Sequence, residues 1–194
     1  MRRAFTAVAA IVLVVVVAIG LASAGGDDGE ETSTDSGPPL SAQRAALEAA
    51  PAPLAALHDQ AGELLGGGAE AFEDRIEALG GYPVVVNKWA SWCGPCRLEF
   101  PHFRNQALKR GAAVAFIGVN SADNDADAQR FLEELPVPFP SYRDPESEVA
   151  EVFKGVVAFP TTAFYDSDGE LVHTKQGQYR TEADLAEDIE RYAK

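Results

Sequence analysis

Apolar and polar positions divide the chain into three parts with different patterns. Residues 4–24 carry no charged side chain over 21 consecutive positions. Residues 25–39 are mainly Gly, Ser, Thr, Pro and acids without a large apolar side chain, so they cannot bury enough surface to fold. After that stretch, short apolar runs alternate with amphipathic ones. The pattern predicts a transmembrane signal-anchor or signal peptide at 1–24, a flexible acidic linker at 25–40 and one domain at 41–194.

Within the domain, strand and helix signals alternate. Residues 83–89 (PVVVNKW) form a β-branched run typical of a buried strand. Residues 69–79 place apolar side chains at i, i+4 and i+7, which predicts an amphipathic helix closed by Gly80 and Gly81. The other expected elements are a helix at 41–50, an ambiguous segment at 53–65 interpreted as an edge strand, a helix from about 93 to 110 kinked by Pro101, strands at 112–119 and 138–142, helices at 124–135 and 145–154, a hairpin at 161–177 with its turn at 166–169, and a last helix starting at Thr181. This order predicts an α/β fold with a central mixed sheet flanked by helices.

The apolar run at 4–24 is long enough to cross a bilayer as a helix. Arg2 and Arg3 precede it and five acidic residues follow, so the positive-inside rule places the domain on the extracytoplasmic side of the cell membrane. Ala22-Ser23-Ala24 matches a signal-peptide cleavage pattern, and a secreted domain is therefore the alternative. Since no cysteine directly follows the run, a lipoprotein anchor is excluded. Either outcome puts the domain where disulfides form.

Charge narrows the range of partners. The formal net charge is −14, and removing the two arginines and five acids of the first 40 residues leaves −11 for the remainder. A domain this acidic would be repelled by phosphate backbones, so we expect no nucleic-acid partner. Most of the acidic residues lie in helix-like segments and are interpreted as a solvated surface.

All the sulfur chemistry of cysteine is confined to Cys93 and Cys96, inside the stretch WASWCGPCRLEFP. A disulfide between them would close too small a loop to stabilise the fold much, so the pair is interpreted as redox-active or as two metal ligands. The pair lies where a strand ends and a helix begins. The helix N-terminus favours the thiolate of Cys93, which we therefore expect to be an exposed nucleophile. Cys96, one turn further on, is placed to resolve a mixed disulfide, while Gly94 and Pro95 permit the tight turn and start the helix.

A metal site would need further ligands, since structural zinc usually takes four. There is no second cysteine pair, and His58, His102 and His173 are scattered along the chain. We therefore expect no metal and no other cofactor. A copper-binding carrier that uses Cys93, Cys96 and His173 remains an alternative of a different class. The Pro, Thr and Cys pattern of a peroxidase has no match here.

The segment Trp92-Cys93-Gly94-Pro95-Cys96, with Pro101 five residues later, resembles the active site of the thioredoxin superfamily. Trp89-Ala90 before the site and Phe159-Pro160-Thr161 before the hairpin are similar to the same family. The resemblance implies a thioredoxin fold in which the peptide bond before Pro160 is cis and Pro160 faces the cysteines, where it shapes the docking of client proteins. Composition alone would not predict that bond, because about 5% of X–Pro bonds in folded proteins are cis.

Cys93, Cys96, Glu99, Phe100 and Pro101 further resemble the Cys-x-x-Cys-x-x-Glu-Phe-Pro pattern of the extracytoplasmic TlpA/ResA-like branch. That resemblance covers roughly residues 50–192, and Asn87 in the preceding strand fits it. Phe159 is bulkier than the residue usual before the cis-proline, which affects partner fit and redox poise.

Several side chains around the cysteines carry further predictions. Glu99 shares a helix face with Cys96, and we hypothesise that it accepts the resolving thiol's proton, rather than being a merely solvated helix residue. Asn87 either serves this site or satisfies backbone groups. Trp89 is expected in the core and Trp92 at the rim of the site, with Phe159 and Thr161 as supporting residues.

The resemblance implies a thiol-disulfide oxidoreductase that reduces disulfides of exported proteins such as apocytochrome c. Its partners would be a client protein with thiols or a disulfide, and a membrane-embedded electron donor. A disulfide-forming oxidant for secreted proteins is the alternative direction of the same chemistry.

Overall fold

Six strands form one mixed sheet in the computed structural model, which describes residues 37–194. In chain order the strands are β1 Leu64–Leu65, β2 Val84–Trp89, β3 Ala115–Ser121, β4 Ser141–Asp144, β5 Thr161–Tyr165 and β6 Leu171–Gln176. Their order across the sheet is β1-β4-β3-β2-β5-β6. The pairs from β1 through β2 are parallel, β5 pairs antiparallel with β2, and β6 pairs antiparallel with β5 as the predicted hairpin. Strand β2, which leads to the cysteines, therefore lies near the centre of the sheet.

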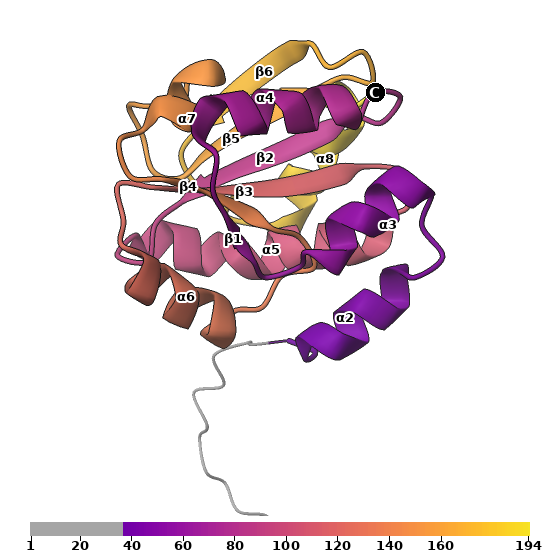
Figure 1. Cartoon of the computed structure of the whole chain (residues 1–194), viewed down its shortest axis with the longest axis horizontal. Coiled ribbons are helices and arrows are strands. Elements are labelled where there is room, and N and C mark those ends of the chain that lie inside the picture. Colours follow the sequence, from indigo (N-terminus) through magenta and orange to yellow (C-terminus); the bar gives the residue numbers. More distant parts are fainter. Residues whose placement is uncertain (1–36) are drawn as a thin grey trace, which may run out of the picture. The chain divides into compact units, whose positions relative to one another are not determined.

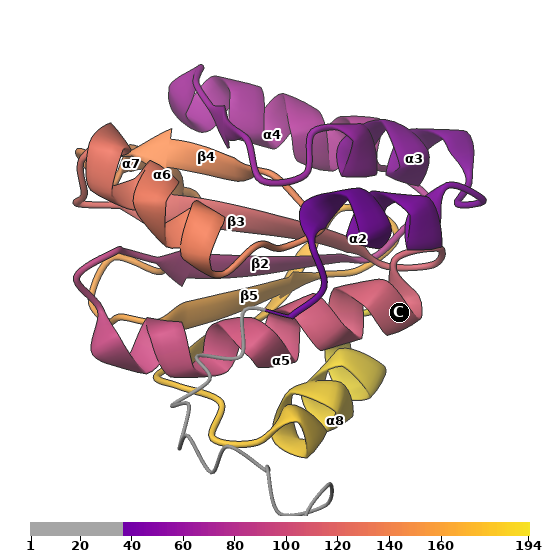
Figure 2. The same cartoon turned by 90° about the horizontal axis from the view of Figure 1, so that it is seen from below.

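Helices cover both faces of this sheet (Figures 1 and 2). They are α2 Leu40–Leu47, α3 Ala52–Asp59, α4 Gly68–Ala78, α5 Gly94–Arg110, α6 Asp125–Glu134, α7 Glu148–Val152 and α8 Glu182–Tyr192. Helix α4 lies on one side of the sheet, with α5 and α8 on the other. The mixed sheet with helices on both faces confirms the fold that the sequence and the thioredoxin resemblance imply.

Strand β2 separates two hydrophobic clusters by the alternation of its side chains. Val85 and Trp89 belong to the cluster that includes residues of α5, α6 and α8. Val84 and Val86 belong to the cluster that includes residues of α3, α4 and α7. All six residues of the strand are buried, as the β-branched run predicts. The period of two puts Asn87 on the α5 side and Lys88 on the opposite side.

The segment 53–65, interpreted as an edge strand, is mainly helical. Pro51 precedes α3, Pro53 lies in its first turn, and Leu54, Leu57 and His58 share its buried face. Only Leu64–Leu65 forms the edge strand β1, paired with β4. The buried i, i+3, i+4 spacing of α3 outweighs the short β-like run, so the edge-strand interpretation was wrong for residues 53–63.

Three further boundaries moved. The strand predicted at 112–119 begins at Ala115, because Gly111–Val114 turn at the end of α5. The strand predicted at 138–142 is Ser141–Asp144, since Pro138 and Pro140 lack a backbone donor. The helix predicted at 145–154 contracts to Glu148–Val152, between Ser147 and Lys154, which both have positive φ.

The predictions for 1–24, and most of the linker at 25–40, lie outside the described residues. Among residues 37–194, no helix combines the length and the apolar character needed to cross a bilayer.

His58 joins the N-terminal helices to the rest of the domain. Its Nδ1 lies 2.9 Å from the carbonyl oxygen of Pro138, and its Nε2 lies 2.8 Å from that of Gly111. The side chain is 3% exposed, so water cannot readily replace it as a partner for these carbonyls.

We expect His58→Ala to lower the free energy of unfolding by about 2 kcal/mol, because buried carbonyls lose a donor and a cavity opens. Urea unfolding, monitored by circular dichroism, measures this change in free energy. The control is His102→Ala, which truncates a half-buried histidine of α5. Equal losses of unfolding free energy in the two variants would show that the contacts of His58 with the Pro138 and Gly111 carbonyls add no specific stability.

Candidate functional site

Cys93 and Cys96 lie at the start of α5, directly after the loop that follows β2. They form a disulfide with a Cα–Cα distance of 5.3 Å. Cys93 is the N-cap of the helix, and its Sγ accepts the amide hydrogen of Cys96 at 3.2 Å. Pro95 lies in the first turn, where a missing N–H leaves no helical bond unmade. An anionic Cys93 sulfur would thus sit at the positive end of a helix with an N–H directed at it.

Cys93 was expected to be exposed, and in the disulfide form it is not. Its exposed fraction is 4%, against 0% for Cys96. Both belong to the cluster on the α5 side of the sheet, against which Phe159 packs. Attack on Cys93 in the disulfide form therefore requires a partner that reaches an almost fully buried sulfur. Cys96 is the more deeply buried of the two. This burial is consistent with its predicted role, which is to resolve a mixed disulfide at Cys93 without contacting the client.

Glu99 is fully buried beneath the cysteines, one helical turn after Cys96. Its Oε1 accepts a hydrogen bond from Asn87 Nδ2 at 2.7 Å, and its Oε2 accepts one from the Tyr179 amide at 2.9 Å. Burial raises the pKa of Glu99 to about 7, against the lowering effects of these two donors and of the Lys175 charge. Glu99 is therefore no solvated helix residue. A carboxyl with this pKa can take up and release a proton near neutral pH.

Asn87 serves Glu99 with its amide group, which decides between the two interpretations of this residue. The amide oxygen of Asn87 is buried and has no hydrogen-bond partner. If the amide turned over, that oxygen could accept a hydrogen from a protonated Glu99. Asn87 can thus match either protonation state of the carboxyl.

Pro160 lies at the same end of the sheet as the cysteines. The Phe159–Pro160 peptide bond is cis, which confirms the expectation from the resemblance. Thr161, the next residue, pairs with Lys88 of β2, and its Oγ1 donates to the carbonyl of Ala158 at 2.8 Å. The register places Pro160 level with Trp89, close to where the chain leaves β2 for the cysteines. Its role in client docking stays a prediction.

The two tryptophans divide as expected. Trp89 is fully buried and stacks on Phe131. Trp92 is 59% exposed, its ring centroid lies 4.8 Å from that of Phe159, and its indole N–H donates to the carbonyl of Ala122 at 3.0 Å. The rim of the site therefore consists of two adjacent aromatic rings from distant parts of the chain.

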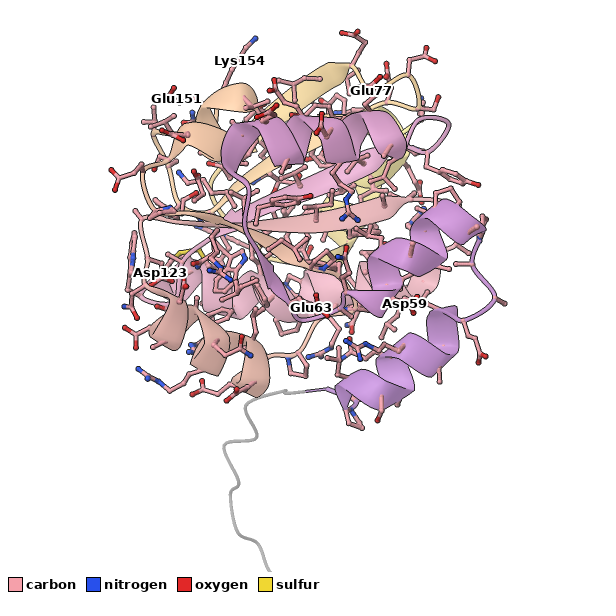
Figure 3. All side chains as sticks on the ribbon, viewed as in Figure 1. Asp59, Glu63, Glu77, Asp123, Glu151 and Lys154 are labelled. Carbon is pink, nitrogen blue, oxygen red and sulfur yellow. A yellow bond between two sulfur atoms is a disulfide. The ribbon has the colours of Figure 1, made fainter. Side chains whose placement is uncertain are left out.

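Sequence reasoning missed the Asp123 carboxylate, which holds the loop before Trp92 (Figure 3). Asp123 accepts hydrogen bonds from the Ser91 amide and hydroxyl and from Asn120 Nδ2. Burial alone would raise the pKa of Asp123, but these bonds outweigh it and hold the pKa below its ordinary value. The sequence signal that could have identified Asp123 is an acidic residue just after the buried strand β3. Other labelled acids in Figure 3, such as Glu63 and Glu77, are exposed, in line with a solvated acidic surface.

Lys88 was also missed, although a charged residue inside an apolar run is itself a signal. Its side chain is fully buried, and its Nζ donates to the carbonyls of Gly155, Val156 and Ala158 at 2.6, 3.1 and 3.2 Å. The same nitrogen lies 3.8 Å from the centroid of the Phe159 ring. Burial lowers the pKa of Lys88, against the opposing effect of Asp144. Lys88 thus fixes the segment that precedes Pro160.

The copper-carrier alternative depends on His173, which packs elsewhere. Its ring stacks on Tyr192 of α8 at 4.1 Å between centroids, and it pairs with Phe164 in the sheet, three residues along β5 from Thr161. Within residues 37–194, no group of three His, Cys, Asp or Glu side chains is arranged to hold a metal ion. The structure therefore gives this alternative no third ligand from His173.

Comparison with known proteins gives consistent matches. The Redoxin family model matches residues 74–189. The chain is 30% identical to the thiol-disulfide oxidoreductase ResA of Oceanobacillus iheyensis, over 53% of this chain and 54% of that protein. It is 38% identical to the thiol:disulfide interchange protein DsbE of Xylella fastidiosa, over 47% of this chain and 45% of that protein. The matched part thus spans about half the length of these curated relatives.

A solved structure extends the likeness to three dimensions. The dsbF protein of MTB, solved in mixed oxidized and reduced forms, aligns with 59% of this chain and 84% of its own at 30% identity and a TM-score of 0.55. The TM-score indicates that the two chains share a fold over the aligned part.

Proposed function

This chain belongs to the Redoxin family, and on that premise we propose that it catalyses thiol–disulfide exchange with client proteins through Cys93 and Cys96. The observation that carries the proposal is the Cys93 sulfur, capped by the Cys96 amide at a helix N-terminus with a buried Glu99 one turn beyond. Relatives named thiol-disulfide oxidoreductase and thiol:disulfide interchange protein support it.

The reaction with a client disulfide balances in two steps. The Cys93 thiolate attacks one client sulfur, which forms a mixed disulfide and releases the other client sulfur as a thiolate. Cys96 then loses its proton to Glu99 and attacks Cys93 Sγ, which re-forms the Cys93–Cys96 disulfide and releases the second client thiolate. Two electrons pass from the protein to the client. The reverse sequence oxidises a client dithiol.

The proposed direction is reduction of disulfides in exported proteins such as apocytochrome c, on the extracytoplasmic side of the cell membrane. Gly94-Pro95 between the cysteines, the apolar run at 4–24 and the resemblance to the TlpA/ResA-like branch support this proposal. A membrane-embedded donor would then return electrons to the Cys93–Cys96 disulfide. The N-terminal segment would keep the domain near that donor.

The reduction potential of the Cys93–Cys96 couple tests the proposal. Equilibration with glutathione or dithiothreitol buffers, followed by alkylation and mass spectrometry, measures it. We expect a value near the roughly −270 mV of thioredoxin, whereas a value near −120 mV would identify an oxidant instead. A pair that does not exchange with either buffer would contradict exchange in both directions. Titration of the reduced protein with copper and zinc tests the carrier alternative in the same samples.

A further inference from the structure

The segment Gly177–Tyr179, which follows β6, touches two parts of the site at once. The Gly177 amide donates to the carbonyl of Pro160 at 2.8 Å. The Tyr179 amide donates to Glu99 Oε2 at 2.9 Å. Nothing in the reaction above uses this segment directly. It nevertheless connects the cis-proline to the buried carboxyl by two short backbone contacts.

Lys175, the second-last residue of strand β6, holds this segment. Its Nζ donates to the carbonyls of Gly177 and Gln178 at 2.8 and 3.3 Å, and it lies 4.2 Å from the centroid of the Tyr179 ring. The side chain is half-buried, so its charge is only partly screened by water. The geometry therefore fixes the two carbonyls that precede the Tyr179 amide, one of them in the same peptide group, and brings a cation towards Glu99.

Among the described residues, Lys175 is the cation whose charge lowers the pKa of Glu99. Asn87 of β2 is neutral, and Cys96 lies one turn earlier on α5. The Tyr179 phenol donates to Asp188 of α8 at 2.7 Å. Burial, then the Asp188 carboxylate, raises the pKa of Tyr179, so the phenol stays neutral. Asp188 contacts the far end of Tyr179, not the amide that Glu99 binds.

We propose that Lys175 is a positioning residue of the site: it clamps the Gly177 and Gln178 carbonyls, holds the Tyr179 amide on Glu99, and keeps a cation beside the buried carboxylate. The inference rests on the proposed exchange reaction, in which Glu99 takes the proton of Cys96. Lys175 then favours the ionised Glu99 that the resolving step requires, without touching either sulfur. Removing the lysine should leave Glu99 protonated to a higher pH.

Three variants test this. Lys175→Met removes the charge and the hydrogen bonds at similar length, Lys175→Arg retains both, and Lys154→Met removes an exposed lysine as the matched control. In the oxidised full-length protein, carboxyl carbon-13 NMR follows the titration of Glu99, assigned by its loss in Glu99→Gln. The pH dependence of the exchange rate is measured on the same variants. Lys175→Gln replaces the Met variant if that one fails to fold.

We expect the Glu99 midpoint to rise by about one pH unit in Lys175→Met and to stay close to wild type in Lys175→Arg and Lys154→Met. The pH–rate profile should shift upward by the same amount. An unchanged Glu99 midpoint in Lys175→Met would overturn the inference. A shifted midpoint with an unchanged pH–rate profile would support the role of Lys175 and instead contradict Glu99 as the proton acceptor in the proposed reaction.

Discussion

A Cys96→Ser variant is expected to stop after the first half of the reaction, with the client linked to Cys93. Cys93 retains its place at the start of α5, where its thiolate faces the positive end of the helix. Without the second sulfur, nothing in the site can displace the client. Non-reducing electrophoresis and intact mass should show a stable one-to-one mixed disulfide, and turnover should fall by at least about 10³-fold.

Cys93→Ser is the matched control because it keeps the same number of sulfurs. We expect it to form no comparable adduct, since Cys96 is fully enclosed and lacks the N-cap position. Both variants should lose turnover to a similar extent. If Cys93→Ser trapped the client and Cys96→Ser did not, the roles of the two sulfurs would be reversed. If neither variant lost turnover, the proposed exchange reaction would be wrong.

The sequence was sufficient to locate the sulfurs because local rules decide their surroundings. The β-branched run Val84–Trp89 predicts a buried strand, and Pro95 predicts a helix start, so the cysteines had to lie between the two. The same reasoning placed Glu99 one turn beyond Cys96. What it left open was whether Glu99 faces water, because that depends on β2 and on the Tyr179 amide, 80 residues away.

Contacts between distant segments explain most of what was missed. Lys88 lies inside an apolar run, and its three carbonyl partners follow it by 67 to 70 residues. Asp123 and Ser91 are 32 residues apart. At 52–59, the prolines and the i, i+3, i+4 spacing were present in the sequence, yet the strand-like composition was given more weight. Local patterns thus indicated where the chemistry lies, while tertiary packing determined the environment of each group.

The second large effect concerns Glu99, whose burial opposes folding once the carboxyl is ionised. Its pKa is raised from 4.5 to about 7 in the folded protein, mainly by burial, so the folded state binds this proton more tightly than the unfolded chain does. Between those two pH values the unfolded chain releases the proton first. The free energy of unfolding therefore falls as pH rises from about 4.5 to about 7, and the loss is complete above that range.

Glu99→Gln should remove this penalty. Tyr179 can still donate to the amide oxygen of the new side chain, and Asn87 can turn over so that its unpartnered oxygen accepts from the new NH₂ group. We expect the oxidised variant to be more stable than wild type by about 3 kcal/mol at pH 8 and nearly equal to it at pH 4. Urea unfolding at both pH values measures the difference in stability. The control is Glu63→Gln, which changes an exposed glutamate. The same variant should lose the inflection near pH 7 in its exchange rate, because no carboxyl remains to take the proton of Cys96. A stability difference that does not change with pH would mean that folding does not raise the pKa of Glu99. An unchanged rate profile would remove Glu99 from the proton transfer.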